Sequence, residues 1–346
     1  MNTLFTFNDM TLIPKYSVVK SRQECDTSIY FDSTVYQTPI MSANMDTITG
    51  VEMAKTLNEA NNIAIPALHR FCTVDENVEM FKNSGSRNTW CSIGTKSTEL
   101  ERFAMLLNAG ALNFVIDIAN GQSDNTFNLY KGIMSLYNPF INVVVGNFSH
   151  DEPLRVFLAK CEAENIKFPY AVKIGVGGGS NCTTREVTGM GYPQASAVHS
   201  VKKMLGVGSP VKIISDGGHK TVGDVCKALV LGADVVMLGG MLSGASQTPG
   251  EVELFNDVPY KVYRGSASLD SYKKQDKVSS HRTPEGISRN VKFKGDVINI
   301  IQAIQAGIRS SMSYSNVYNL RDYKDLTRWE RISASSYLEG TAHGNH

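Results

Sequence analysis

The sequence lacks the features that mark several large classes of protein. Its 34 basic and 33 acidic residues give a formal net charge of +1, so no general positive field would hold a nucleic acid. No apolar run approaches the ~20 residues of a membrane-spanning helix, and no secretory leader is recognisable at the N-terminus. The six cysteines form no CxxC pair and no His/Cys cluster, so we expect no zinc site. We therefore expect a cytoplasmic protein with neither a nucleic acid nor a membrane as partner.

The chain does contain short apolar runs separated by segments of helical length. The predicted strands are 38–43, 62–68, 89–94, 113–119, 141–147, 170–176, 211–218 and 234–240, and the predicted helices include 51–61, 99–110, 151–165 and 222–233. Most runs are continuously apolar, as parallel strands buried on both faces are. Gly110 and Gly232 stand where helix C-termini are expected. Eight strand–helix units favour an α/β fold of the (β/α)8 TIM-barrel type, with a doubly wound open sheet as the alternative.

A long insertion follows the eighth run. Residues 243–290 exceed the length of a structural turn, so we predict a lid or flap, with a solvated loop as the alternative. We predict that residues 298–314 form the last barrel helix, and we expect a disordered tail from about 338 to 346. The whole chain, 1–346, is predicted to form a single catalytic domain.

Small and polar residues follow nearly every predicted strand, and in a TIM barrel these positions converge at one mouth. Gly217 and Gly218 follow the seventh run, and Gly239 and Gly240 end the eighth. Glycine lets backbone N–H groups approach an anion closely, so this pattern predicts a phosphate site. Asp216 suits ribose hydroxyls as an acceptor. The pattern indicates a nucleotide monophosphate or a sugar phosphate, and the alternative is two glycine-rich turns without a ligand.

Cys182 lies in the glycine loop "GVGGGSNCTTR" (175–185). Most lone cysteines are small buried side chains, as we expect for Cys91 and Cys226. A glycine loop instead exposes a thiol, and Arg185 with the backbone dipoles would favour the thiolate. We therefore predict that Cys182 is a nucleophile. The loop carbonyls could equally bind a monovalent cation, whereas no acidic cluster marks a divalent one.

Several collinear segments resemble the IMP dehydrogenase/GMP reductase family. They are "FNDMTLIPK", "SANMDT", "GSNCTTR", "GMGYPQASAV", "SDGG", "VMLGGM" and "PEG", and they cover about residues 5–330. Three features favour the reductase branch. The chain has no room for the paired regulatory domain usually inserted in the dehydrogenases, "CTTR" is followed by "TGMGYPQ", and "DIANG" resembles the reductase "DVANG". The short flap also lacks the Arg-Tyr pair with which dehydrogenases activate water.

The resemblance implies a homotetramer that carries out NADPH-dependent reductive deamination of GMP to IMP and ammonia. Cys182 would add to C2 of the purine, and ammonia would depart, so that a covalent thioimidate remains on the enzyme. A hydride from NADPH would then release IMP. Thr184 and Glu285 would manage the proton given to the departing ammonia.

The resemblance also implies a set of binding residues. The substrate residues are Ser180, Asp216, Gly217, Gly218, Gly239, Gly240, Gly265, Ser266, Arg282 and Gly286. The cofactor residues are Ser21, Arg22, Arg70, Asp117, Ile118, Ala119, Val176, Gly177, His281, Ser310, Ser311 and Ser313. The potassium ligands are Gly177, Gly179, Cys182 and Arg185.

The chain departs from the reductase pattern at a few places. Gly178 replaces the proline of "GIGPGSVCTT", which loosens the loop, and Arg70 replaces a lysine, to which it is not equivalent. The flap has "YRGSAS" for "YGMSS". The alternatives are a minimal IMP dehydrogenase producing XMP with NAD, a reductase acting on dGMP or a modified purine monophosphate, and a non-catalytic purine-nucleotide sensor. A further alternative is a barrel enzyme that binds a flavin.

Overall fold

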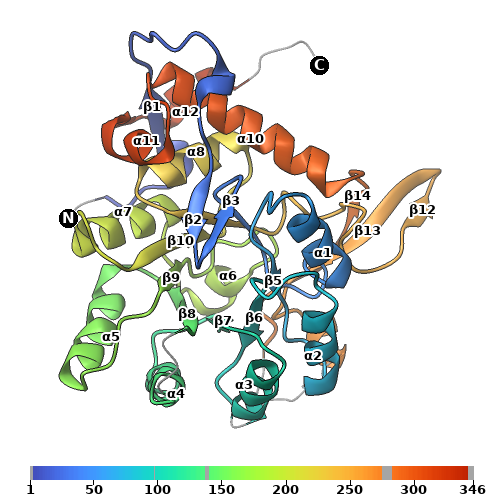
Figure 1. Ribbon diagram of the computed structural model, residues 1–346. Coiled ribbons are helices and arrows are strands. Elements are labelled where there is room, and N and C mark those ends of the chain that lie inside the picture. The colour runs from blue at the N-terminus through green and yellow to red at the C-terminus, as the bar shows by residue number, and fades with distance from the viewer. Residues whose placement is uncertain (1–2, 97, 137–139, 275–282, 342–346) are drawn as a thin grey trace.

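The centre of the protein is a sheet of eight parallel strands (Figure 1). The computed structural model describes residues 3–96, 98–136, 140–274 and 283–341. The strands are β4 (Ile40–Ser42), β5 (Ala67–Leu68), β6 (Trp90–Ile93), β7 (Asn113–Asp117), β8 (Asn142–Phe148), β9 (Ala171–Ile174), β10 (Lys212–Asp216) and β11 (Val235–Leu238). Their order is β4-β11-β10-β9-β8-β7-β6-β5. Each of them overlaps one predicted run, so these predictions are confirmed.

The sheet closes between its first and last strands through Ile65, which precedes β5. The Ile65 N–H donates to the carbonyl of Ile40 at 2.8 Å, and the Ser42 N–H donates to the carbonyl of Ile65 at 2.9 Å. A TIM barrel is therefore confirmed, and the open-sheet alternative is wrong.

Helices surround the barrel (Figure 1). They are α1 (Val51–Glu59), α2 (Val74–Lys82), α3 (Thr98–Asn108), α4 (Asp124–Met134), α5 (Asp151–Ala163), α7 (Gln194–Leu205), α8 (Val222–Val230) and α10 (Val297–Tyr314). Local signals set their ends. Thr221 and Asp224 form a capping box that starts α8, which satisfies N–H groups that have no partner inside the helix. Gly110 and Gly232 follow α3 and α8 with φ of +99° and +120°, as predicted for helix-ending glycines.

The core lies inside the barrel and between its strands and helices. Six of the seven residues of β8 are buried, which explains why the predicted strands are continuously apolar. Lys173 is the exception among the buried positions of β9, because it places a charged side chain inside the barrel.

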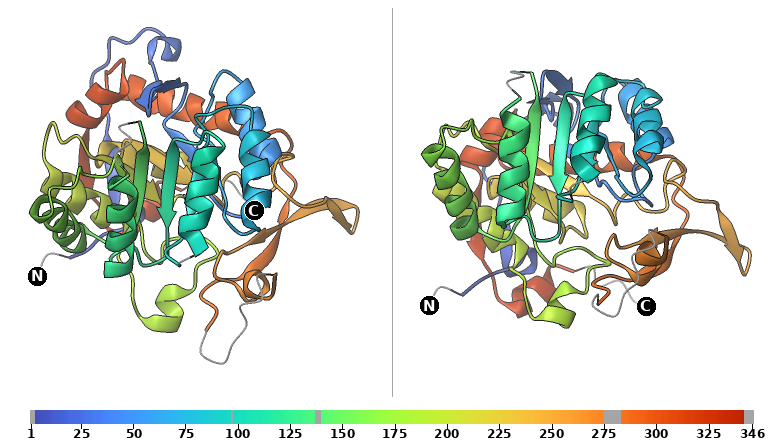
Figure 2. Two further views of the ribbon diagram at one scale, coloured as in Figure 1. Left: turned by 60° about the horizontal axis from the view of Figure 1, so that its bottom comes forward. Right: turned by 90° about the horizontal axis from the view of Figure 1, so that it is seen from below.

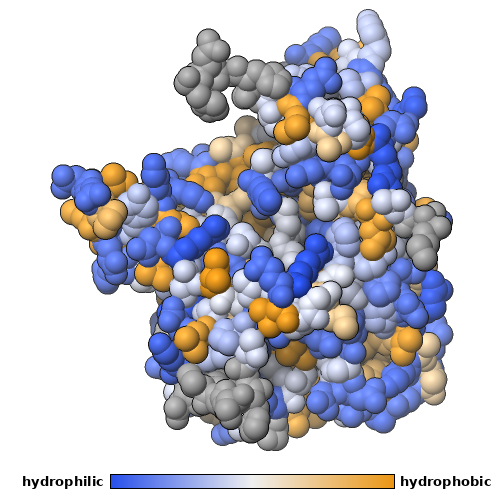
Figure 3. Space-filling model, turned by 180° about the vertical axis from the view of Figure 1, so that it is seen from behind, coloured by the Kyte–Doolittle hydropathy of each residue, from blue (hydrophilic) through white to orange (hydrophobic). Residues whose placement is uncertain are grey.

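The insertion after β11 has secondary structure of its own. It contains β12 (Glu253–Phe255), β13 (Val258–Arg264) and β14 (Ser288–Lys292) in an antiparallel sheet, with α9 (Leu269–Lys274) between the last two. The β12–β13 hairpin projects from the body, and its exposed apolar side chains include Leu254 and Phe255 (Figures 2 and 3). Residues 275–282 lie outside the described residues. That the whole insertion, residues 243–290, acts as a lid or flap stays a prediction.

The terminal segments pack beside the barrel. β1 (Met10–Ile13) pairs with β15 (Arg328–Arg331), and β2 (Ile29–Phe31) pairs with β3 (Thr34–Tyr36). The short helices η1 (Phe7–Asp9), η2 (Arg22–Glu24), α6 (Thr184–Thr188), α11 (Leu320–Leu326) and α12 (Ala334–Glu339) complete the described chain.

The predicted tail begins too early, because Leu338 and Glu339 still belong to α12. Residues 342–346 are not described. Across the described ranges, no helix combines the length and apolarity required to span a membrane.

Candidate active site

The loops at the carboxyl ends of the barrel strands and the insertion enclose a cavity of about 240 Å³. Many of the predicted site residues line it, from segments far apart in the sequence. They are Asp117, Ile118, Ala119, Val176, Gly177, Gly179, Ser180, Cys182, Thr184, Asp216, Gly217, Gly218, Gly239, Gly240, Gly265, Ser266, Glu285 and Gly286. The expected convergence of these loops at one mouth is therefore observed.

The glycine loop begins directly after β9 at a position where only glycine fits. Gly175 has a φ of +146°, and a Cβ atom there would lie 1.9 Å from the backbone oxygen of Asp216. The loop then folds back on itself, because the Cys182 N–H donates to the Gly179 carbonyl at 3.0 Å. This turn brings Cys182 to the cavity wall just before α6.

Backbone hydrogen bonds join the cysteine loop to the insertion. The Thr183 N–H donates to the Glu285 carbonyl at 2.8 Å, and the Ile287 N–H donates to the Asn181 carbonyl at 2.9 Å. The Asn181 amide, on a side chain with almost no exposure, donates to the Tyr263 carbonyl at 3.0 Å. Figure 2 shows α6 beside the insertion on one side of the barrel. The position of Glu285 is therefore set by the loop that carries the cysteine.

Cys182, Thr184 and Glu285 form a hydrogen-bonded chain. The Cys182 Sγ lies 3.1 Å from the Thr184 Oγ1, and this hydroxyl donates to the Glu285 Oε2 at 2.7 Å. Because the threonine has a single proton and gives it to the carboxylate, the thiol is the donor in the first contact. A proton can therefore pass from sulfur to carboxylate through one hydroxyl. By contrast, Cys91 and Cys226 are buried, which confirms that they are core residues.

Glycine residues that follow β10 and β11 line the cavity and supply backbone N–H groups there. Gly217 and Gly218 have positive φ values of +89° and +83°. Within the described chain, the N–H groups of Gly218 and Gly240 have no backbone or side-chain acceptor. Ser180 adds a hydroxyl, which donates to the Tyr263 hydroxyl at 3.3 Å. Free backbone donors beside hydroxyls fit a phosphate group.

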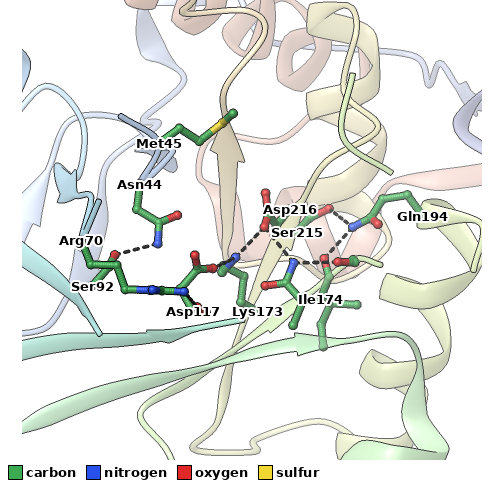
Figure 4. Close-up of polar contacts among 12 residues, drawn as sticks. Asn44, Met45, Arg70, Ser92, Asp117, Lys173, Ile174, Gln194, Ser215 and Asp216 are labelled. Atoms are coloured by element: carbon green, nitrogen blue, oxygen red, sulfur yellow. Dashed lines mark hydrogen bonds and ion pairs between the residues drawn. The ribbon is translucent and has the colours of Figure 1, made fainter. Parts of the chain in front are cut away.

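Beside these donors, one buried lysine joins two carboxylates (Figure 4). The Lys173 Nζ lies 2.6 Å from the Asp117 Oδ1 and 2.7 Å from the Asp216 Oδ2. The Asn147 amide also donates to the Asp216 Oδ2, at 2.9 Å. Burial alone would lower the pKa of Lys173, but the two carboxylates outweigh burial and raise this pKa well above its usual value. The lysine is therefore charged.

Arg70 lies behind the cavity wall. Its guanidinium donates to the Asp117 carbonyl at 3.2 Å and stacks on the Phe71 ring at 5.2 Å. It packs over Gly94, where a Cβ would lie 3.0 Å from the guanidinium carbon. Arg70 lines a second, neighbouring cavity of about 950 Å³ with His69 and Lys96. It therefore supports Asp117 and does not face the first cavity.

The remaining predicted cofactor residues lie elsewhere. Ser21, Arg22, Ser310, Ser311 and Ser313 line neither cavity. The Arg22 guanidinium instead lies 5.8 Å from the Tyr314 ring centroid, near the C-terminal end of α10. The Ser311 hydroxyl bonds to the Tyr323 hydroxyl, and the Ser313 hydroxyl donates to the Ser310 carbonyl. Their role as cofactor residues stays a prediction. His281 and Arg282 lie outside the described residues.

The glycine loop offers oxygen ligands of the kind that a monovalent cation requires. It presents backbone carbonyls and no carboxylate, and in the described ranges no group of three or more His, Cys, Asp or Glu side chains is arranged for a metal ion. Arg185 packs over Gly177, and its guanidinium donates to the Tyr192 carbonyl. That Gly177, Gly179, Cys182 and Arg185 hold K⁺ stays a prediction, and Arg185 does not line the cavity.

Sequence reasoning missed several residues that line the cavity, including Lys173, Asn147, Tyr263 and His219. Burial lowers the pKa of His219 to about 4, although Asp216 and Asp224 oppose the shift, so its imidazole is neutral near pH 7. The signal that could have found Lys173 is the charged residue inside the apolar run "YAVKIGV". Nothing comparable marks the other three.

Comparisons with known proteins agree with this geometry. The family model described as "IMP dehydrogenase / GMP reductase domain" matches residues 4–343. GMP reductase 2 of Bos taurus is 36% identical over 341 residues, covering 94% of each chain. Inosine-5'-monophosphate dehydrogenase of Cryptosporidium parvum is 31% identical over 392 positions, covering 98% of this chain and 94% of its own. In fold, the chain resembles a cysteine-to-alanine variant of Trypanosoma brucei GMP reductase, solved with guanosine 5'-monophosphate. The TM-score is 0.89 at 23% identity, covering 100% of this chain and 99% of that one.

Proposed function

This chain belongs to the IMP dehydrogenase/GMP reductase family, and on that premise we propose that it catalyses the NADPH-dependent reductive deamination of GMP to IMP and ammonia. The observation that carries the proposal is the hydrogen-bonded chain Cys182–Thr184–Glu285 at the wall of a cavity with phosphate-type donors. Relatives named GMP reductase support the reductase branch.

The proposed reaction begins with the Cys182 thiol. Its sulfur bonds to C2 of the purine while the π electron pair of the C2=N3 bond moves onto N3, the thiol proton moves to Thr184 and the threonine proton moves to Glu285. Glu285 then returns a proton through Thr184 to the C2 amino group. The electron pair on N3 re-forms the C2=N3 bond as the C–N bond to the amino group breaks, so ammonia departs and the thioimidate stays on Cys182. Ammonia takes up a further proton from solvent. General acid–base transfer of this kind contributes about 10²–10⁴ in rate.

NADPH, when bound, supplies the hydride that reduces C2. The C–S bond then breaks, IMP leaves, and the Cys182 thiolate takes a proton from solvent. The purine is reduced by two electrons, and the nicotinamide is oxidised by the same two. Asp117, Ile118 and Ala119 would hold the cofactor on their side of the cavity.

The nucleotide would be held by its phosphate and its ribose. Gly218 and Gly240 offer free N–H groups to the phosphate, Ser180 offers a hydroxyl, and the Asp216 carboxylate would accept from the ribose hydroxyls. We further propose that K⁺ orders the glycine loop and that the enzyme is a cytoplasmic homotetramer.

The test is to incubate the protein with GMP and NADPH and to follow both loss of the reduced-nicotinamide absorbance and release of ammonia. We expect turnover, no turnover in Cys182→Ala, and slower turnover when Na⁺ replaces K⁺. No reaction with GMP or dGMP would overturn the proposal. GMP binding without turnover, unchanged by Cys182→Ala, would indicate a nucleotide sensor.

The second candidate is a minimal IMP dehydrogenase, which the Cryptosporidium parvum relative favours. In that case the protein would form NADH from IMP and NAD and would leave GMP unchanged. Running both assays on one preparation separates the two activities.

A further inference from the structure

We propose that Lys173 is a positioning residue that joins the nucleotide half of the cavity to the cofactor half, by fixing the carboxylates of Asp216 and Asp117 with one buried ammonium group. The inference rests on the proposed function only for the identity of the two ligands. It concerns a residue that does not itself need to touch either of them.

The geometry places Lys173 between the two halves. It projects from β9, and its two carboxylate partners end β7 and β10, on either side of it in the barrel (Figure 4). The lysine side chain is 3% exposed, whereas the side chains of Asp117 and Asp216 are 18% and 23% exposed. The carboxylates are therefore more exposed than the lysine, although all three residues line the cavity.

The contacts leave acceptor capacity for a ligand. Lys173 and Asn147 both bond to the Oδ2 of Asp216. Among the described residues, no donor contacts its Oδ1, so this oxygen is available to ribose hydroxyls. Fixing one oxygen from behind orients the other toward the cavity, which reduces the ordering that a ligand would otherwise impose.

The charges around the cluster explain why a lysine is needed. Asp117 faces Lys173 from β7 with Arg70 behind it, and Asp216 faces it from β10 with the neutral His219 nearby. Two carboxylates that share a partly buried site without a cation cannot both stay ionised, so one takes up a proton. Burial favours protonation of Asp117, but Lys173 outweighs burial and holds the pKa of that carboxyl below its usual value. An apolar side chain at residue 173 would fill the space without this effect.

The main test compares Lys173→Met with Lys173→Arg in steady-state assays from about pH 6 to pH 8. In Lys173→Met we expect KM for both GMP and NADPH to rise at least about tenfold, and to rise further as the pH falls, because a protonated carboxyl is a poorer acceptor. Lys173→Arg keeps the charge and should keep the pH profile of KM that the wild type shows, including the part that comes from the ligands' own phosphates. Thermal unfolding checks that both variants fold.

The double variant Lys173→Met/Asp117→Asn gives a matched control. It restores the net charge of the cluster, because the lost ammonium is balanced by the lost carboxylate. We expect KM for GMP to recover the pH profile of the wild type while KM for NADPH stays high. A purely structural role of Lys173 would produce no such separation of the two substrates.

A direct binding measurement keeps the inference testable if Lys173→Met does not fold. In Asp117→Asn the Lys173 ammonium has Asp216 as its only carboxylate partner in the part of the chain that the structure describes. The stronger Lys173–Asp216 ion pair then makes the Asp216 carboxylate a poorer acceptor for the ribose hydroxyls of GMP. We therefore expect calorimetry without NADPH to show GMP affinity lowered several-fold, although Asp117 lies on the cofactor side. Without the link through Lys173, loss of a negative charge would leave the affinity of an anionic nucleotide unchanged or raise it.

The inference is overturned if Lys173→Met keeps wild-type KM values at every pH, if Lys173→Arg behaves like Lys173→Met, or if Asp117→Asn binds GMP as well as the wild type or better. Failure of the reductase proposal is recognised separately. The wild type would then bind GMP in the calorimeter but release no ammonia.

Discussion

Replacing Thr184 with valine would isolate the step that the hydrogen-bonded chain performs. Valine has almost the same shape as threonine but has a methyl group in place of the hydroxyl that contacts both Cys182 Sγ and Glu285 Oε2. No direct hydrogen bond joins Cys182 to Glu285 within the described residues, so the methyl group interrupts the only protein path for the proton between them. Thr184→Ser keeps the hydroxyl and is the matched control.

The magnitude follows from what is lost. A positioned proton-transfer group contributes about 10²–10⁴ in rate, so we expect kcat to fall by that factor, which corresponds to about 3–5.5 kcal/mol in the barrier. KM for GMP should change by less than about threefold, because Thr184 contacts none of the phosphate donors. Glu285 is only half-buried, so water can replace the lost hydroxyl, and we expect the free energy of unfolding to fall by less than ~1 kcal/mol.

Two measurements check the prediction. Steady-state rates with GMP and NADPH give kcat and KM, and intact-protein mass spectrometry after rapid quenching detects the purine bound to Cys182. The Thr184→Val adduct should form far more slowly than the wild-type adduct, while Thr184→Ser should stay within about tenfold of the wild type. A Thr184→Val enzyme within about fivefold of the wild type, or a Thr184→Ser enzyme equally slow, would refute the relay.

Two further predictions concern the glycine loop. Gly178 lies outside the left-handed region, and a Cβ atom there would meet nothing closer than 3.5 Å. Gly178→Pro should therefore keep or improve activity and add roughly 0.4–1 kcal/mol of stability. A folded but inactive Gly178→Pro variant would show that this loop does not act as the proline-containing loop of the family does. Gly175→Ala should cost at least about 2 kcal/mol, because its Cβ would lie 1.9 Å from the Asp216 carbonyl oxygen. Denaturant unfolding, with Gly178→Ala as control, measures this cost, and equal stability of the two alanine variants would contradict it.

The barrel could be predicted from local sequence patterns. Strands buried on both faces must be continuously apolar, and helices begin at capping residues and end at glycines such as Gly110 and Gly232. These signals are contained in a few neighbouring residues, so they can be read without knowing the fold. The closure of the barrel at Ile65 depends on the curvature of the whole sheet and has no local signal.

Sequence motifs likewise predicted part of the candidate active site. Residue chemistry and backbone freedom are local properties, so the sequence alone places Cys182 in an exposed glycine loop and glycine pairs after the last two strands. It could not exclude Arg70 from the first cavity, nor show that α12 extends to Glu339. Both outcomes depend on packing against neighbouring elements.

Which groups act on one another depends on the folded chain as a whole. Thr184 meets Glu285 across 101 positions of sequence. Lys173 meets Asp216 from the neighbouring strand β10, and it meets Asp117 of β7 across Gly146 of β8, which has no side chain between them. The same lysine in an exposed strand would be solvated and have little effect on either carboxylate. Its effect on charge and position comes from burial between two partners, and burial arises only when distant segments pack together.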